Sequence, residues 1–229
     1  MKRFLPLLII LLAMALIYVF GIQHYFSFEA VKKYHQTLKG FVAIHPLATA
    51  FLYILIYITA TTLSIPGAIF FTLLGGYLFP QPLSTLYAVF SATCGAMLIF
   101  LAARTALKEV LKKKAAPFFK KMEKGFQKNA ASYLLFLRFV PLFPFWLVNI
   151  VPAFFNVPLK TYVWTTLVGI TPASIVFTLA GGGLEKVFEN EAPFSISALF
   201  NTEIKIALAL FVILVLIPPI LKRFKKAND

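Results

Sequence analysis

The sequence predicts an all-α polytopic membrane protein, in which two re-entrant helical hairpins form an inverted repeat beside about four full transmembrane helices. Hydrophobic residues make up 60% of its 229 residues and charged residues only 13%, a composition that excludes a soluble globule. Lysines and arginines gather in short segments beside the apolar runs. One apolar run is interrupted by prolines and an arginine, which a simple transmembrane helix rarely contains.

The first apolar run, residues 4–22, follows Lys2 and Arg3 and has the length of about 20 residues that a bilayer crossing needs. A secretory signal is the alternative, because Ala13 and Ala15 have the spacing of a cleavage site. We favour an uncleaved transmembrane helix, because apolar residues continue beyond these alanines.

Residues 23–45 mix charged and apolar side chains. The apolar positions recur at helical spacing, at residues Val31, Tyr34, Leu38 and Phe41. We therefore predict an amphipathic helix that lies on the membrane surface. Residues 1–45 would form an N-terminal unit of one transmembrane and one interfacial helix.

No charged residue occurs from position 46 to position 103, a run too long for one crossing. Small or helix-breaking residues punctuate its middle, namely Pro66, Gly67, Gly75 and Gly76. We predict a re-entrant hairpin over residues 46–79, turned near Pro66, and a full transmembrane helix over residues 83–103.

Residues 104–128 are strongly basic, with apolar side chains at three- and four-residue steps. This pattern predicts one or two amphipathic helices, the second starting at Pro117, where proline is tolerated. The segment is either a solvated loop or a surface helix on anionic headgroups, where each basic residue contributes about 1 kcal/mol. We favour contact with headgroups.

The run from residue 136 to residue 169 contains Arg138, and an arginine at membrane depth costs roughly 2.5 to more than 10 kcal/mol. Its helix-breaking residues are Pro141, Pro144, Pro152 and Pro158. Broken helix is tolerated in a bilayer only where protein covers it or it lines a wet cavity. We predict a second re-entrant hairpin over residues 131–152 and a transmembrane helix over residues 158–183.

Residues 185–229 would complete the chain with an acidic external loop, a last transmembrane helix at 206–221 and a basic tail. The lysines and arginines assign the basic segments and both termini to the cytoplasmic side of a cell inner or plasma membrane. The hairpin-containing core then extends over residues 46–184.

An internal repeat supports this topology. The segment FPQPLST at residues 79–85 shares Phe, Pro, Leu and Thr, at the same spacing, with FNVPLKT at residues 155–161. Each copy follows a predicted hairpin and precedes a crossing. Inverted repeats of broken helices place the substrate site of many transporters near the membrane midplane.

The sequence resembles the DedA / VTT-domain (SNARE-associated Golgi protein) superfamily, in particular the Tvp-type branch and its bacterial relatives. Five motifs carry the resemblance: PG at 66–67, LGGYLF at 74–79, FLAAR at 100–104, FLRFVP at 136–141 and GITP at 169–172. The resemblance implies two re-entrant hairpins and a role in moving lipids between leaflets, with family arginines at Arg104 and Arg138. The first hairpin lacks the acidic residues of DedA proteins proper, so proton coupling is not carried over.

Arg138, Arg104 and Asn149 are the candidate substrate-binding residues, because a buried arginine can grip a phosphate. For Arg138 and Arg104 the alternative is a side chain that snorkels to the surface, and this alternative is stronger for Arg104, which lies closer to the end of a crossing. The hairpin and packing candidates are Pro66, Gly67, Gly75, Gly76, Pro141, Pro144, Gly169 and Pro172. The sequence contains no catalytic set and no metal-ligand spacing, so we expect neither an enzyme nor a cofactor.

The leading hypothesis is a flippase- or scramblase-like protein that moves phospholipid or polyprenyl phosphate between leaflets. A transporter of small solutes or ions, and a membrane scaffold or assembly factor, are the alternatives. The expected partners are phosphate-bearing or anionic membrane lipids and not nucleic acid, and a homo-oligomer is compatible with the sequence.

Overall fold

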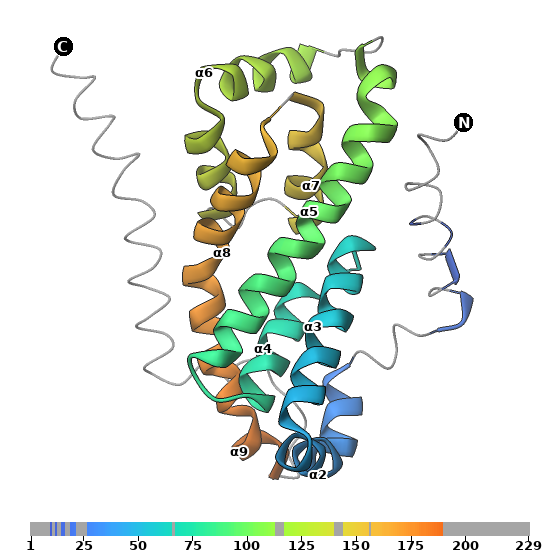
Figure 1. The fold of residues 1–229 in the computed structure, drawn as a ribbon, viewed down its shortest axis with the longest axis vertical. Coiled ribbons are helices and arrows are strands. Elements are labelled where there is room, and N and C mark those ends of the chain that lie inside the picture. The colour runs from blue at the N-terminus through green and yellow to red at the C-terminus, as the bar shows by residue number, and fades with distance from the viewer. Residues whose placement is uncertain are drawn as a thin grey trace, which may run out of the picture.

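The computed structural model describes residues 10, 12, 15, 16, 19–21, 27–65, 67–112, 117–139, 144–155 and 157–189. Within them the structure has helices and no strand (Figure 1). The elements are α2 (Phe28–Ile44), α3 (Pro46–Thr62), α4 (Ala68–Leu78), α5 (Leu83–Lys112), α6 (Pro117–Phe139), α7 (Phe145–Ile150), the 3-10 helix η3 (Val151–Phe155), α8 (Leu159–Gly182) and α9 (Leu184–Glu189). The all-helical fold class is therefore confirmed.

Two of these helices are long and apolar enough to cross a membrane, namely Leu83–Ala106 and Leu159–Gly182. They correspond to the crossings that the sequence predicts over 83–103 and 158–183. The bent pair of α2 and α3 is a third candidate if it is taken as one span. The other predicted crossings, at 4–22 and 206–221, lie largely or wholly outside the described residues.

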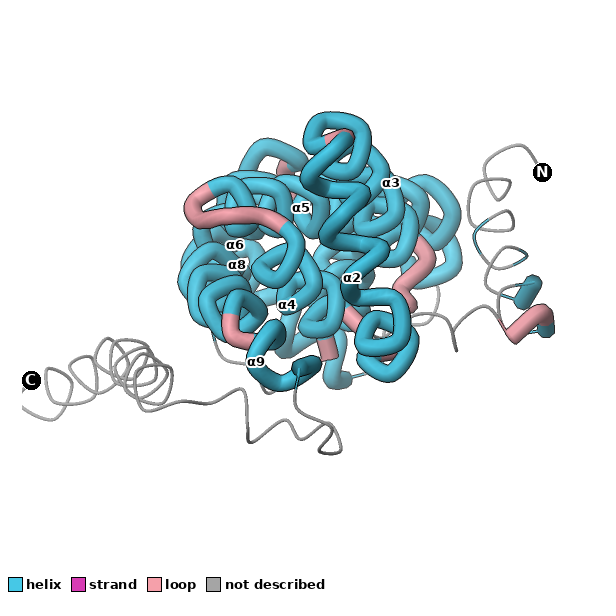
Figure 2. The backbone as a smooth tube through the Cα atoms, turned by 90° about the horizontal axis from the view of Figure 1, so that it is seen from below, coloured by secondary structure: helices cyan, strands magenta, loops and turns pink. Residues whose placement is uncertain are grey.

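The segment after the first predicted crossing does form a helix, α2, which starts where Ser27 Oγ accepts a hydrogen bond from the Ala30 N–H at 3.2 Å. The helix is kinked at Tyr34 and meets α3 at a bend of 120°. Seen from below, α2 lies across the end of the helix bundle, near α4 and α9 (Figure 2).

Helices α3 and α4 form a hairpin. The turn contains Ser64 at φ 53° and Gly67 at φ 154°, where residues other than glycine are strained. Two tyrosines of α3 tie the arms together: Tyr53 donates to the Phe71 carbonyl at 2.9 Å and Tyr57 to the Ala68 carbonyl at 3.0 Å. Pro66 lies outside the described residues.

Both halves of the fold pack on the long helices α5 and α8. The first arm of the hairpin, α3, packs on α5, while α4 packs on α8. In the second half α6 packs on α8, while α7 and η3 pack on α5. The long helices begin at Leu83 and Leu159, each directly after the proline of the repeated motif, because a proline fixes the chain in an orientation from which a helix can start.

Helix α6 begins at Pro117, as the sequence predicts, and breaks at Asn129. The Asn129 Oδ1 atom accepts a hydrogen bond from the Ser132 N–H at 3.0 Å, so it caps the part of α6 that leads to Arg138. Pro141 lies outside the described residues.

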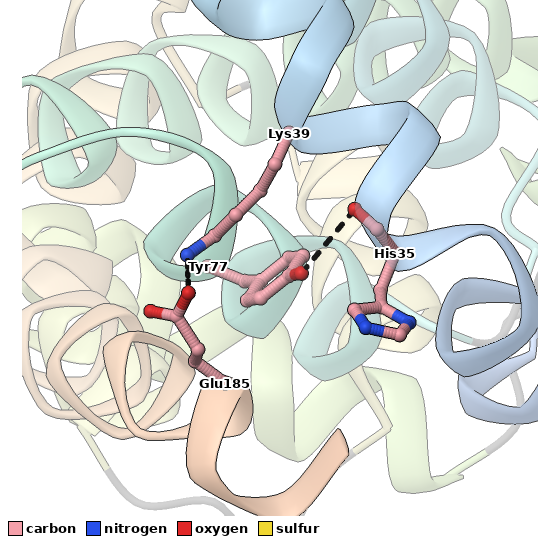
Figure 3. Close-up of polar contacts among 4 residues, drawn as sticks. All are labelled: His35, Lys39, Tyr77 and Glu185. Carbon is pink, nitrogen blue, oxygen red and sulfur yellow. Dashed lines mark hydrogen bonds and ion pairs between the residues drawn. The ribbon is translucent and has the colours of Figure 1, made fainter. Parts of the chain in front are cut away.

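The end of the bundle that carries α2 also carries α9 (Figure 1). Figure 3 shows the contacts that join them: the Lys39 ammonium pairs with the Glu185 carboxylate, and the Tyr77 hydroxyl donates to the His35 carbonyl at 3.5 Å. The ring of Phe188 packs edge-on against Tyr77. These contacts attach α2 to the end of α4 and to α9.

Candidate functional site

Arg138 lies in the last turn of α6 and faces α8. Its Nη2 atom donates hydrogen bonds of 2.9 Å to the Tyr162 hydroxyl and of 2.9 Å to Thr166 Oγ1. Tyr162, Thr166 and Gly169 recur at four- and three-residue steps, so they share one face of α8. The face that binds Arg138 is therefore encoded by a helical repeat of polar and small residues.

Tyr162 connects this arginine to two more elements. Its ring stacks on Phe100 of α5 with centroids 4.2 Å apart. Its hydroxyl oxygen lies 3.1 Å from Asn149 Oδ1 and 3.2 Å from the Ala96 carbonyl oxygen, and a hydroxyl has one proton to donate to either of them. Asn149 is only 1% exposed. The network thus joins α5, α6, α7 and α8.

Three buried nitrogens of this network have no hydrogen-bond partner among the described residues, namely Nε and Nη1 of Arg138 and Nδ2 of Asn149. An unpartnered buried donor costs about 1–3 kcal/mol, and more when it is charged. The rings of Phe145 and Tyr162, 5.2 and 5.5 Å from the guanidinium carbon, offset part of this cost through cation–π attraction.

The stretches of chain that pack around Arg138 contain no carboxylate that could serve as its counter-ion. The chain has no Asp or Glu from position 30 to 108 or from 124 to 184. The guanidinium thus retains two unpartnered donor nitrogens, Nε and Nη1, that an anion from outside the protein would satisfy.

Arg138 lines a cavity of about 300 Å³ between α4, α6 and α8. A second cavity, of about 380 Å³, contains Asn149 and Ser64. Both cavities are lined by Phe145 and by Ala68 and Ile69 at the start of α4. The start of α4 and the start of α7 therefore meet at this site, and Gly67 and Pro144 line the second cavity.

Arg138 and Asn149, which the sequence singles out, are brought together through Tyr162. Arg104 is placed elsewhere: its Nη1 donates to the Val157 carbonyl at 3.2 Å, its guanidinium lies 6.0 Å from the Phe100 ring, and it lines neither of these two cavities. Arg104 thus holds α5 against the segment between η3 and α8.

The predicted small residues mediate helix contacts. A Cβ atom on Gly75 would collide with the Tyr53 side chain, and one on Gly76 with the Thr178 backbone. Gly169 faces Arg138, and Pro172 lies inside α8, where its ring removes one backbone hydrogen bond. Sequence reasoning missed Tyr162, Thr166 and Ser64. A signal for the first two was their four-residue spacing on a predicted crossing.

Arg138 and the residues that it contacts lie in the part of the chain that is similar to known proteins. A family model described as the VTT domain matches residues 65–182. Transmembrane protein 41B of Mus musculus is 34% identical over 176 residues, which cover 75% of this chain and 58% of that protein. The Homo sapiens protein of the same name is 32% identical, over 67% of this chain and 51% of its own length.

A Caenorhabditis elegans transmembrane protein 41 homolog is 29% identical, over 76% of this chain and 70% of that protein. The chain thus spans between half and two thirds of the length of the two 41B relatives. The comparison with solved structures gave no significant match.

Proposed function

The chain belongs to the VTT domain family of membrane proteins, and from this premise we propose that it moves phosphate-bearing lipids between the two leaflets of its membrane. The lipid phosphate binds Arg138 during passage, while the acyl chains remain in the bilayer. No covalent chemistry is involved. The movement is a transport step and not an enzymatic reaction.

The architecture we infer is an inverted pair of re-entrant hairpins. The exit of the first hairpin is tied to the C-terminal part of α8, where Gln81 Nε2 donates to Thr178 Oγ1 at 2.6 Å. The exit of the second hairpin is tied to α5 by the hydrogen bond from Arg104 to the Val157 carbonyl. In Figure 1, α4 lies in the lower part of the bundle and α7 in the upper part, which supports hairpins that enter from opposite sides.

The observation that carries the proposal is the buried, incompletely bonded guanidinium of Arg138 beside a cavity. Apart from this arginine and the hydroxyls of Tyr57, Thr72 and Ser174, the cavity is lined by apolar residues. An anion that entered it would satisfy the Nε and Nη1 donors and regain the cost of burying them. A lipid phosphate is a suitable anion because its attached chains favour the same apolar surroundings.

In this proposal lipid movement is passive, and the difference in lipid concentration between the two leaflets sets its direction. A proton relay through the membrane needs carboxylates or histidines in the spanning region, and the chain has no Asp or Glu from position 30 to 108 or from 124 to 184. The basic segments on the cytoplasmic side of a cell inner or plasma membrane would hold anionic headgroups, which supplies lipid to the site.

Reconstitution in liposomes tests this function. Fluorescent phospholipid and polyprenyl phosphate are followed from the inner leaflet by quenching at the outer surface, with empty liposomes as the baseline. The parent protein is compared with Arg138→Gln and with Lys160→Gln, because Lys160 is an exposed cation near the start of α8. We expect lipid movement from the parent and from Lys160→Gln, and little from Arg138→Gln.

Each other result has a defined meaning. Movement no faster than in empty liposomes would contradict lipid transport. Leakage of a small anion without lipid movement would favour a solute transporter that uses the same cavity. Equal lipid rates for the parent and Arg138→Gln would show that the phosphate does not bind this arginine.

A further inference from the structure

The second cavity, of about 380 Å³, differs chemically from the cavity that holds Arg138. Its lining residues are Thr61, Ser64, Ile65, Gly67, Ala68, Ile69, Pro144, Phe145 and Asn149. None of them carries a charge. Two of them nevertheless have buried polar atoms without a hydrogen-bond partner among the described residues, Ser64 Oγ and Asn149 Nδ2. Such groups are costly unless something binds them.

Phe145 separates the two cavities. Its side chain lines both of them, and its ring lies 5.2 Å from the guanidinium carbon of Arg138. A molecule that extends past this ring would place an anionic group at Arg138 and a neutral group at Ser64 and Asn149. The two unpartnered groups of the second cavity include an amide donor and a hydroxyl, so the neutral group must accept hydrogen bonds.

We propose that the cavity lined by Ser64 and Asn149 is a binding site for the ester carbonyls of a glycerolipid whose phosphate is bound by Arg138. This assignment rests on the proposed function and adds to it a second, uncharged contact. Carbonyl oxygens accept hydrogen bonds without bringing charge into an uncharged cavity, so they match its chemistry. A phosphate carried on a plain hydrocarbon chain would leave Ser64 and Asn149 unpartnered.

Ser64→Ala gives the sharpest test, because Ser64 Oγ has no hydrogen-bond partner among the described residues, so its loss breaks no hydrogen bond there. We expect Ser64→Ala to slow the movement of a diacyl phospholipid about two- to tenfold, the effect of one lost hydrogen bond. Movement of a polyprenyl phosphate, which has no ester, should stay at the parental rate. Thermal unfolding in detergent should show that the variant is folded.

A binding measurement separates this inference from lipid transport itself. Cys94 is the chain's single cysteine, so Cys94→Ala supplies a background in which Ser64→Cys can be labelled by a small thiol reagent. The probes offered as protectants are dihexanoyl phosphatidic acid, farnesyl phosphate and inorganic phosphate. We expect the diacyl probe to slow labelling while the other two do not, and Asn149→Leu in the same background to abolish that protection.

Equal protection by farnesyl phosphate or by inorganic phosphate, or protection by none of the probes, would overturn the ester site. If the parent moves lipid but Ser64→Ala moves diacyl phospholipid equally fast, the proposed function stands and this inference fails. If the parent moves no lipid, the proposed function fails, and the labelling result still decides whether the cavity binds ester carbonyls.

Discussion

Gly169 of α8 and Arg138 of α6 are in contact: a Cβ atom on Gly169 would lie 2.5 Å from Arg138 Cβ and 3.0 Å from its Cγ. The missing side chain lets α6 approach α8 at the level of the arginine. The guanidinium thereby reaches Tyr162 and Thr166 on the same face of α8. The glycine sets the position of the charge.

Gly169→Ala is therefore expected to displace Arg138 and to weaken lipid movement by about tenfold, which corresponds to about 1.4 kcal/mol. Overpacking at this contact should also destabilise the fold by about 1–3 kcal/mol. Gly40→Ala in α2 is the matched control, because a Cβ atom there has nothing within 4 Å. Liposome assays and thermal unfolding measure both effects. Parental values for Gly169→Ala would contradict this role for the glycine.

Tyr162→Phe keeps the ring that stacks on Phe100 and removes only the hydroxyl. Arg138 Nη2 and Asn149 Oδ1 would each lose a partner, so the stability should fall by about 1–3 kcal/mol. Lipid movement should also fall, because the arginine is no longer held in place. Tyr87→Phe, whose ring packs on Phe79, serves as the control in the same assays. A Tyr162→Phe variant as stable as Tyr87→Phe would mean that the hydroxyl network does not support the fold.

The sequence was sufficient to find Arg138 and Asn149, because polar groups in an apolar run are costly and therefore conspicuous. Pro82 and Pro158 likewise predicted where the long helices begin. Thr166 was missed because threonine hydroxyls in helices commonly bond to their own backbone, and Tyr162 was missed because it carries no charge that would mark it in an apolar run. The partner of both hydroxyls is Arg138, and this contact depends on which faces of α6 and α8 meet. Gly169 permits the contact, but this becomes visible only when both helices are packed together.

Arg104 is a second residue whose hydrogen-bond partner could not be predicted from the sequence. The sequence places it at the end of a crossing, a position equally compatible with a side chain at the headgroups, in a substrate site or on a backbone carbonyl. Its bond to Val157 depends on the second hairpin returning to the end of α5. That long-range packing has no local signal in the residues around Arg104.

Gly181→Ala should disrupt the contact between α4 and α8, because a Cβ atom there would overlap the Leu73 carbonyl. Backbone cannot move aside as a flexible side chain can, so we expect a loss of about 1–3 kcal/mol or more. The adjacent Gly182→Ala should cost much less, since its nearest atom would be 3.8 Å away. The unfolding temperatures of the two variants in detergent test this difference. Equal temperatures would show that α4 and α8 are not packed so closely.

The Lys39–Glu185 pair should contribute little to stability, because the two side chains are 40% and 50% exposed. A double-mutant cycle with Lys39→Met and Glu185→Gln should give a coupling of about 0.2–1 kcal/mol. The coupling should shrink as salt is raised, since salt screens exposed charges. A larger, salt-independent coupling would indicate that the pair is buried when the protein is in its membrane.

Arg104→Gln separates a structural arginine from a substrate-binding one. The change removes the bond to the Val157 carbonyl and the contact with the Phe100 ring, which together should cost about 1–2 kcal/mol of stability. Arg104 lines neither of the cavities at the hairpin turns, so lipid movement per folded molecule should fall much less than in Arg138→Gln. The reverse pattern, with unchanged unfolding and a rate as low as that of Arg138→Gln, would mean that Arg104 also binds the lipid phosphate.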